Sequence, residues 1–208
     1  MREGLERQQH RVELAATVLL ACAAVATAWS TYQSARWRGQ QAARTSKATA
    51  ARIQSSSAQT RGGQQTQIDI ATFIQWVDAT VSGKPKLAQF YRHRFRPEFR
   101  PAFDAWLATH PRTNAKAPLT PFAMPQYVVA EAVKASTLNT TAGKLADGAE
   151  AANKRANDYV LGVVLFAACL FFAGISTKLH SLRQREVLVA IGWAIFAGSF
   201  VWLVVLAV

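Results

Sequence analysis

The sequence predicts an all-α membrane protein with three transmembrane helices and a helical domain between the first and the second. Three long stretches, 14–35, 159–177 and 187–208, contain no charged residue. At about 1.5 Å per residue, each is long enough as a helix to cross a hydrocarbon layer of roughly 30 Å. The segment between the first two stretches is polar and strongly basic, and no alternating pattern in it predicts a strand.

These stretches divide the chain into membrane-spanning and water-exposed parts. The long central segment is expected to form a helical bundle with a stalk (36–66 and 134–158) and a head (67–133). The predicted boundaries are a short N-terminal tail (1–13), the first span (14–35), the water-exposed domain (36–158), the second span (159–177), a short basic loop (178–186) and the third span (187–208).

The first span also resembles an export signal in two ways. Ala26 and Ala28 have the spacing of a leader cleavage site, and 19–22 approximates the lipobox of a bacterial lipoprotein, with Cys22 as the acylated residue. Against cleavage, the glutamates of the tail cancel its arginines, whereas a signal sequence normally begins with a net positive charge. Against lipidation, the chain stays apolar after Cys22. We therefore favour a retained span, with a cleaved leader and a lipoprotein as alternatives.

The residue types in the spans bear on packing and on transport. The first span is rich in alanine, and Ala24 and Ala28 would let another helix approach closely, so we expect it to be the most enclosed of the three. Ala194 and Gly198 offer the same opportunity in the third span. No span contains Asp, Glu, Lys, Arg or His, which argues against transport by a single copy. The alternative that several copies together form a pore is still compatible with the sequence.

The short polar segments predict the orientation. The tail and the loop 178–186 each carry three basic residues, and three spans place both segments on the same side of the membrane. The positive-inside rule makes that side cytoplasmic, so the N-terminus is expected in the cytoplasm and 36–158 outside it. The flanks of the domain are also basic and favour the opposite orientation, but long domains cross the membrane largely regardless of charge.

The two stalk segments consist of good helix formers with little apolar surface. Ile53 is the only large aliphatic residue in 36–66, and 134–158 is rich in alanine. Neither helix could fold alone, but their small side chains would let them pack closely, side by side and antiparallel. The alternative is that both segments are partly disordered.

The head contains apolar residues at helical spacing between helix-stop signals. A helix is predicted over 64–82, after a break at the glycine pair 62–63 and before a stop at 83–85. A second helix begins near Lys86. The apolar residues of these two helices are Ile70, Phe73, Ile74, Val77, Val81, Phe90, Phe95, Phe99, Phe103 and Trp106.

Prolines divide the rest of the head. Pro97 and Pro101 fall inside the second helix, where they predict a kink or a split. The last helix is expected to start near Pro125, a favourable first-turn residue, and to continue into the second span.

Charge and cysteine usage limit the partners. The chain has a net charge of +12, and 36–158 alone holds 18 basic and 8 acidic residues, a net charge of +10. Such an excess favours polyanions, namely phospholipid head groups, envelope polymers or nucleic acid. Membrane lipid is the nearest of these, so lipid is the expected partner and nucleic acid is not; the alternative is an ordinary solvated surface. Cys22 and Cys169 both lie in predicted spans, so the exposed domain has no disulfide framework.

Four arginines are the candidate binding residues. Arg92, Arg96 and Arg100 recur every four residues, with Arg94 beside them. On one helix, the first three would form a line suited to phosphate or carboxylate groups, which predicts a contact with anionic lipid or with a partner. The alternative is a solvated helix face opposite the phenylalanines.

No pattern predicts a catalytic residue, a metal or a cofactor. Glu98 and Asp104, the closest acidic pair in the head, lie six residues apart and would align poorly on a helix. The segment 61–63 lacks the Lys-Ser/Thr of a phosphate loop and is interpreted as a hinge. The histidines lack the spacing of a zinc site. They are His10, His93, His110 and His180.

Four segments, 28–33, 73–78, 95–106 and 171–177, together resemble a group of uncharacterised bacterial membrane proteins with three spans. The resemblance covers nearly the whole chain, but its motifs are structural. It implies the bacterial cell (inner) membrane as the location and adds no activity.

We therefore expect a non-enzymatic, multi-pass membrane protein that binds a partner, senses a ligand or serves as an accessory subunit through its helical exposed domain. The cytoplasmic segments are too short for an effector domain, so the protein would act through another membrane or envelope protein. The sequence also allows several copies of the chain to form a homo-oligomer. The alternative function is a component of an oligomeric channel or transporter, and an enzyme ranks third.

Overall fold

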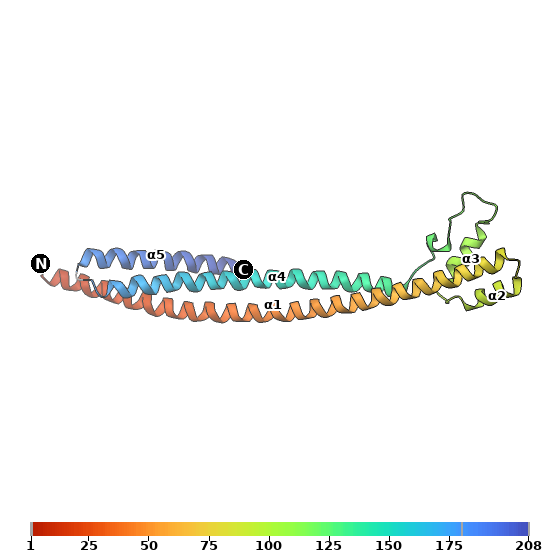
Figure 1. The fold of residues 1–208 in the computed structure, drawn as a ribbon. Helices are drawn as coiled ribbons and strands as arrows, with labels where there is room; N and C mark the ends of the chain where they lie inside the picture. The colour runs from red at the N-terminus through yellow and green to blue at the C-terminus, as the bar shows by residue number, and fades with distance from the viewer. Residues whose placement is uncertain (1, 180, 208) are drawn as a thin grey trace. The chain divides into compact units, whose positions relative to one another are not determined.

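The computed structural model describes residues 2–179 and 181–207, with only the backbone described for 2–6, 206 and 207, and every regular element in this part of the chain is a helix (Figure 1). The all-α prediction is therefore confirmed. The elements are α1 (Arg2–Val81), α2 (Pro85–Arg94), α3 (Arg100–Ala108), the short 3-10 helix η1 (Pro121–Ala123), α4 (Ala130–Ser176) and α5 (Leu182–Ala207).

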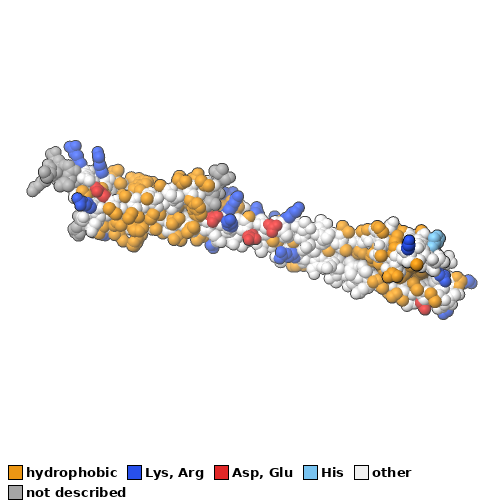
Figure 2. Space-filling view, turned by 90° about the horizontal axis from the view of Figure 1, so that it is seen from above, with side chains coloured by type: hydrophobic (Ala, Val, Ile, Leu, Met, Phe, Trp, Pro, Cys, Tyr) orange, Lys and Arg blue, Asp and Glu red, His pale blue; other side chains and the backbone are white. Residues whose placement is uncertain are grey.

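The chain forms two compact units. We call Met1–Ser46 with Leu145–Val208 the span unit, and Lys47–Lys144 the aromatic unit. Three helices, α1, α4 and α5, contain stretches that are long and apolar enough to cross a membrane, as the sequence predicts. Figure 2 shows hydrophobic side chains covering a broad band on the visible face of the span unit, with charged side chains at the ends of that band.

Close packing in the span unit depends on two glycines. A Cβ atom at Gly162 of α4 would lie 2.9 Å from a methyl group of Leu203, and one at Gly192 of α5 would lie 2.7 Å from a methyl group of Leu19. Nearby, the rings of Phe166 and Phe196 are 5.5 Å apart. The absence of side chains at the two glycines therefore lets α5 approach both α4 and α1.

The predicted packing of the spans is wrong in two respects. The apolar stretch of α4, and not that of α1, is the most buried of the three, because α4 contacts residues of both other helices. Ala194 is exposed, and nothing lies within 4 Å of a Cβ built at Gly198. A small residue permits close approach only where it faces a neighbouring helix, and composition alone does not say which face that is.

Helices α1 and α4 run antiparallel within each unit. In the aromatic unit, the Ser55 hydroxyl donates a hydrogen bond of 2.7 Å to the carbonyl oxygen of Ala135. In the span unit, Arg44 donates to the carbonyl oxygen of Gly148 at 2.6 Å, and Arg155 lies 4.7 Å from the centre of the Trp37 ring. The segments 36–66 and 134–158 are helical throughout, so the alternative of partial disorder does not apply to them.

The paired helices bury small residues at seven-residue intervals. This spacing keeps one face of each helix turned toward the other, and alanine at the contact positions allows a close approach. The buried residues of this seam in the aromatic unit include Ala48, Ser55 and Gly62 on α1, and Ala135 and Ala142 on α4; within the span unit, α4 buries Ala149 and Ala156 at the same spacing.

Enlarging one residue of this seam is expected to destabilise the pair. Ala142 is fully buried, so Ala142→Leu should cost about 1–3 kcal/mol through overpacking. The matched change Ala151→Leu, at an exposed position of the same helix, should have little effect. Thermal unfolding of the full chain followed by circular dichroism measures both; equal melting temperatures for the two variants would contradict the close packing.

The predicted break at the glycine pair 62–63 is wrong, because α1 continues through it. Gly62 is buried, and a Cβ there would lie 3.3 Å from the backbone nitrogen of Ala132. The glycine therefore serves the approach of α4 and is not a hinge.

The stop at the end of this helix is confirmed. Helix α1 ends at Val81, and Gly83 follows in the left-handed conformation with a φ of 66°. The split at the proline pair is also confirmed, because α2 ends at Arg94 and α3 begins at Arg100. Helix α4, however, begins at Ala130 and not near Pro125.

The core of the aromatic unit consists almost entirely of aromatic rings. Residues from α1, α3 and the α2–α3 turn meet there, and η1 and the segment after it cover them. Most ring pairs are edge-to-face, as at Phe95 and Phe103, whose centres are 4.8 Å apart. The buried members are Phe73, Phe95, Phe99, Phe103 and Trp106.

Candidate functional site

The four predicted binding arginines do not share one helix. Arg92 and Arg94 lie at the end of α2, Arg96 lies in the turn between the helices, and Arg100 is the first residue of α3. The expected line along a single helix is therefore wrong, because the proline-containing segment splits that helix.

Three of these arginines make local contacts. Arg92 forms an exposed ion pair of 2.8 Å with Asp104 of α3, and Arg94 lies 4.6 Å from the centre of the Phe90 ring. Arg100 donates hydrogen bonds to the carbonyl oxygens of Phe95 and His93 at 3.1 and 2.9 Å. These contacts join α2, the turn and α3, while contact with anionic lipid or a partner stays a prediction.

The fourth arginine belongs to a buried polar network. Arg96 donates two hydrogen bonds to the fully buried Asp69 carboxylate, from Nε at 2.9 Å and from Nη2 at 3.1 Å. The Tyr127 hydroxyl donates a third at 3.2 Å. The hydrogen bond with Asp69 raises the pKa of the Arg96 guanidinium, so the guanidinium stays protonated. The network ties α1 to the α2–α3 turn and to the segment before α4.

Asp69 was not among the residues predicted from the sequence. It lies seven residues after Gly62 and four before Phe73, so it occupies the register of the buried positions of α1. A charged residue in that register must find a partner, because burying an unpaired charge is costly. The position of Asp69 among the buried residues of α1 was the sequence signal that could have identified it.

The network predicts a loss of stability at high pH. Burial is the largest cause that raises the pKa of Tyr127, so the folded chain holds the phenol proton more tightly than the unfolded chain does. The stabilisation is complete below the ordinary tyrosine pKa of about 10 and is lost as pH rises through the higher folded value. We expect the melting temperature to fall above about pH 10, and to fall less steeply in Tyr127→Phe. Thermal unfolding of the original chain and of Tyr127→Phe across this pH range tests the prediction. If the two melting temperatures fell in parallel, the prediction would be wrong.

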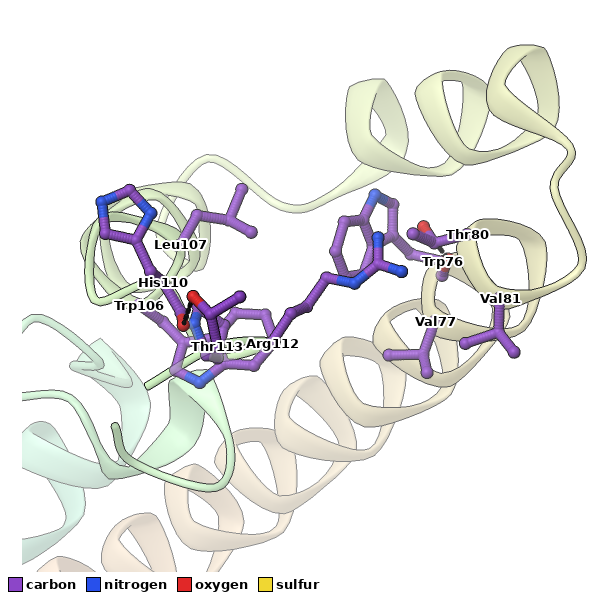
Figure 3. Close-up of a pocket in the computed structure, with 10 residues that line it drawn as sticks. Trp76, Val77, Thr80, Val81, Trp106, Leu107, His110, Arg112 and Thr113 are labelled. Carbon is purple, nitrogen blue, oxygen red and sulfur yellow. Dashed lines mark hydrogen bonds between the residues drawn. The ribbon is translucent and has the colours of Figure 1, made fainter. Parts of the chain in front are cut away.

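A second feature of the aromatic unit is an open apolar groove with a volume of about 400 Å³ (Figure 3). Trp76, Val77 and Val81 of α1 form one wall, and Trp106 and Leu107 of α3 form the other. The sequence places Val77, Val81 and Trp106 among the apolar residues of the head, yet 78% of the Val81 surface is exposed. Folding therefore leaves the last turn of α1 without a covering element.

The turn 110–113 closes one end of the groove in a defined conformation. His110 follows α3 with a φ of 54°, in the left-handed region that histidine enters more readily than most residues. Backbone hydrogen bonds from Thr113 and Asn114 to the His110 carbonyl oxygen, at 3.0 and 2.9 Å, hold the turn. Figure 3 shows the Arg112 side chain extending from this turn across the groove toward Trp76.

Comparison of the chain with models of known families, with curated proteins and with solved structures finds no match. Among the described side chains of 7–179 and 181–205, no group of three or more His, Cys, Asp or Glu residues could hold a metal ion. His180 lies outside the described residues.

Proposed function

We propose that this protein is a non-enzymatic membrane protein that binds an apolar ligand in the groove of the aromatic unit. The groove is the observation that carries the proposal. Its volume of about 400 Å³ lies within the range of about 300–1,000 Å³ of small-molecule pockets, and its walls are mainly apolar and aromatic, as in such pockets. A ligand that covers Val81 and the neighbouring rings gains the free energy of removing apolar surface from water.

The polar groups of the aromatic unit favour binding over catalysis. Asp69, Glu98, Asp104 and Glu131 all form ion pairs with arginines. In the groove itself, the Thr80 hydroxyl donates to the carbonyl oxygen of Trp76 at 2.8 Å. These polar groups are thus occupied by contacts within the protein, which supports a role in recognition.

The proposed location is the bacterial cell membrane, with the N-terminus in the cytoplasm and the aromatic unit outside it. Three apolar helices support insertion in a membrane, and the basic tail and loop support the orientation. We also propose that 36–66 and 134–158 form a stalk. The antiparallel pairing of α1 and α4 within each unit supports this proposal. Ligand binding in the groove would act on another membrane or envelope protein.

Site-resolved photolabelling tests this function. The full chain, in nanodiscs of phosphatidylcholine, is irradiated with a long-chain alcohol that carries a diazirine, and the labelled peptides are mapped by mass spectrometry. We expect adducts on 76–81 and 106–113 in addition to those on the spans, which serve as an internal reference. Adducts confined to the spans would contradict the proposal.

A pair of variants distinguishes the groove from general exposed apolar surface. Val81→Trp places a bulky ring at the groove and should reduce the groove adducts, whereas Ile74→Trp lies on the exposed surface of the same helix outside the groove. Equal losses in both variants would assign the labelling to non-specific adsorption.

A further inference from the structure

We propose that the ligand of this groove is a single-chain amphiphile with an anionic head, such as a long-chain carboxylate, and that Arg112 binds the head. The inference rests on the proposed function and specifies its ligand class. It depends on three properties of the aromatic unit, which are the distribution of unpaired charge, the position of Arg112 and the mainly apolar character of the groove walls.

The aromatic unit has many more cations than anions. Residues 47–144 hold 13 Lys and Arg and 5 Asp and Glu. Within the described residues, four of the five acids form ion pairs, with Arg61, Arg92 and Arg96. Ten of the 13 cations, Arg112 at the groove among them, therefore have no acidic partner in this unit, and the net field of the unit favours a negatively charged ligand.

Arg112 is the cation placed to bind such a ligand. It is exposed on the turn whose backbone hydrogen bonds hold it against the groove, and its side chain extends over the apolar walls (Figure 3). No hydrogen bond or ion pair occupies its guanidinium among the described residues. A planar guanidinium binds a carboxylate through two parallel hydrogen bonds, and with unusual strength when both are shielded from water.

The walls of the groove require the rest of the ligand to be apolar. The indole N–H of Trp106 donates to the carbonyl oxygen of Pro118 at 2.7 Å, and the Thr80 hydroxyl is occupied within α1. A sugar or a peptide would bury several amide or hydroxyl groups against walls that offer few partners, which is costly. A hydrocarbon chain has no such groups, so it fits the walls while the head stays at Arg112.

The size and charge of the groove disfavour three other occupants. A volume of about 400 Å³ is near the lower end of the range for ligand pockets, which favours one chain over a two-chain phospholipid. An α-helix is about 10–12 Å across with its side chains, so it could cover the mouth but not enter. A second copy would bring a second strongly basic unit against the first.

The test compares a photoreactive long-chain carboxylate with the alcohol of the same chain and the same diazirine position, on the full chain in phosphatidylcholine nanodiscs at pH 8. We expect at least about tenfold more groove labelling, relative to span labelling, by the carboxylate, because about 1.4 kcal/mol from charge-assisted hydrogen bonds at an exposed arginine corresponds to a factor of ten. Arg112→Gln should reduce the ratio of carboxylate to alcohol labelling in the groove to about one. Lys116→Gln, a charge removal in the same loop outside the groove, should preserve the difference.

Each other outcome has a distinct meaning. Equal groove labelling by acid and alcohol would overturn the anionic head and leave the proposed function standing. The absence of groove labelling by both would overturn both proposals. Groove labelling by photoreactive phosphatidylglycerol in the nanodisc, without labelling by the free acid, would assign the groove to membrane lipid and overturn the single-chain ligand. Labelling only by a photoreactive acidic amphipathic peptide would assign it to a protein partner and overturn the inference.

Discussion

Asp69→Ala is expected to destabilise the aromatic unit by about 3–5 kcal/mol, because it leaves the largely buried Arg96 guanidinium without its carboxylate. The Tyr127 hydroxyl loses its acceptor as well. Hydrogen exchange of the full chain, followed by mass spectrometry on peptides from 85–108, measures the local effect. Since about 1.4 kcal/mol corresponds to a factor of ten, exchange should accelerate by at least roughly a hundredfold.

Two comparisons separate the buried charge from general damage. Asp104→Ala breaks the exposed pair with Arg92 and should change stability by less than about 1 kcal/mol. The double variant Asp69→Leu with Arg96→Met replaces the buried pair with apolar side chains and should recover most of the loss. If Asp69→Ala and Asp104→Ala had equal effects, the network would not support the fold as described.

Phe103→Ala is expected to cost about 3–5 kcal/mol, through lost burial and the cavity that remains. The side chain is 1% exposed, and its ring contacts those of Phe73, Trp76 and Phe95 at centre distances of 6.4, 4.8 and 4.8 Å. Because rings from α1, the turn and α3 converge on this residue, its removal should increase exchange throughout 95–108.

Phe90→Ala is the matched control for that experiment. Phe90 is 49% exposed on α2 and lies outside the aromatic core, so its truncation should cost well under half as much. Similar exchange in the two variants would mean that the rings around Phe103 do not determine the stability of the unit. Span peptides in the same samples report whether the effect is confined to the aromatic unit.

The sequence could predict those features that depend on local composition and backbone chemistry. Three uncharged stretches predict three helices apolar enough for a membrane, since hydrophobic length is a property of the segment itself. Gly83 and the proline pair at 97 and 101 predict the end of α1 and the split between α2 and α3 for the same reason, because they alter the backbone at their own positions.

Tertiary packing decided the remaining features. The helix continues through Gly62 because the approach of α4 needs a residue without a side chain there, and a helical glycine costs only about 1 kcal/mol relative to alanine. Asp69 is tolerated at a buried position because Arg96 and Tyr127, which are distant in the sequence, donate hydrogen bonds to its carboxylate. The groove exists because α3 and the turn 110–113 cover only part of the apolar face of α1. Periodicity shows that a face is apolar, but which part of it stays open depends on where the other helices lie, and that is a property of the folded chain.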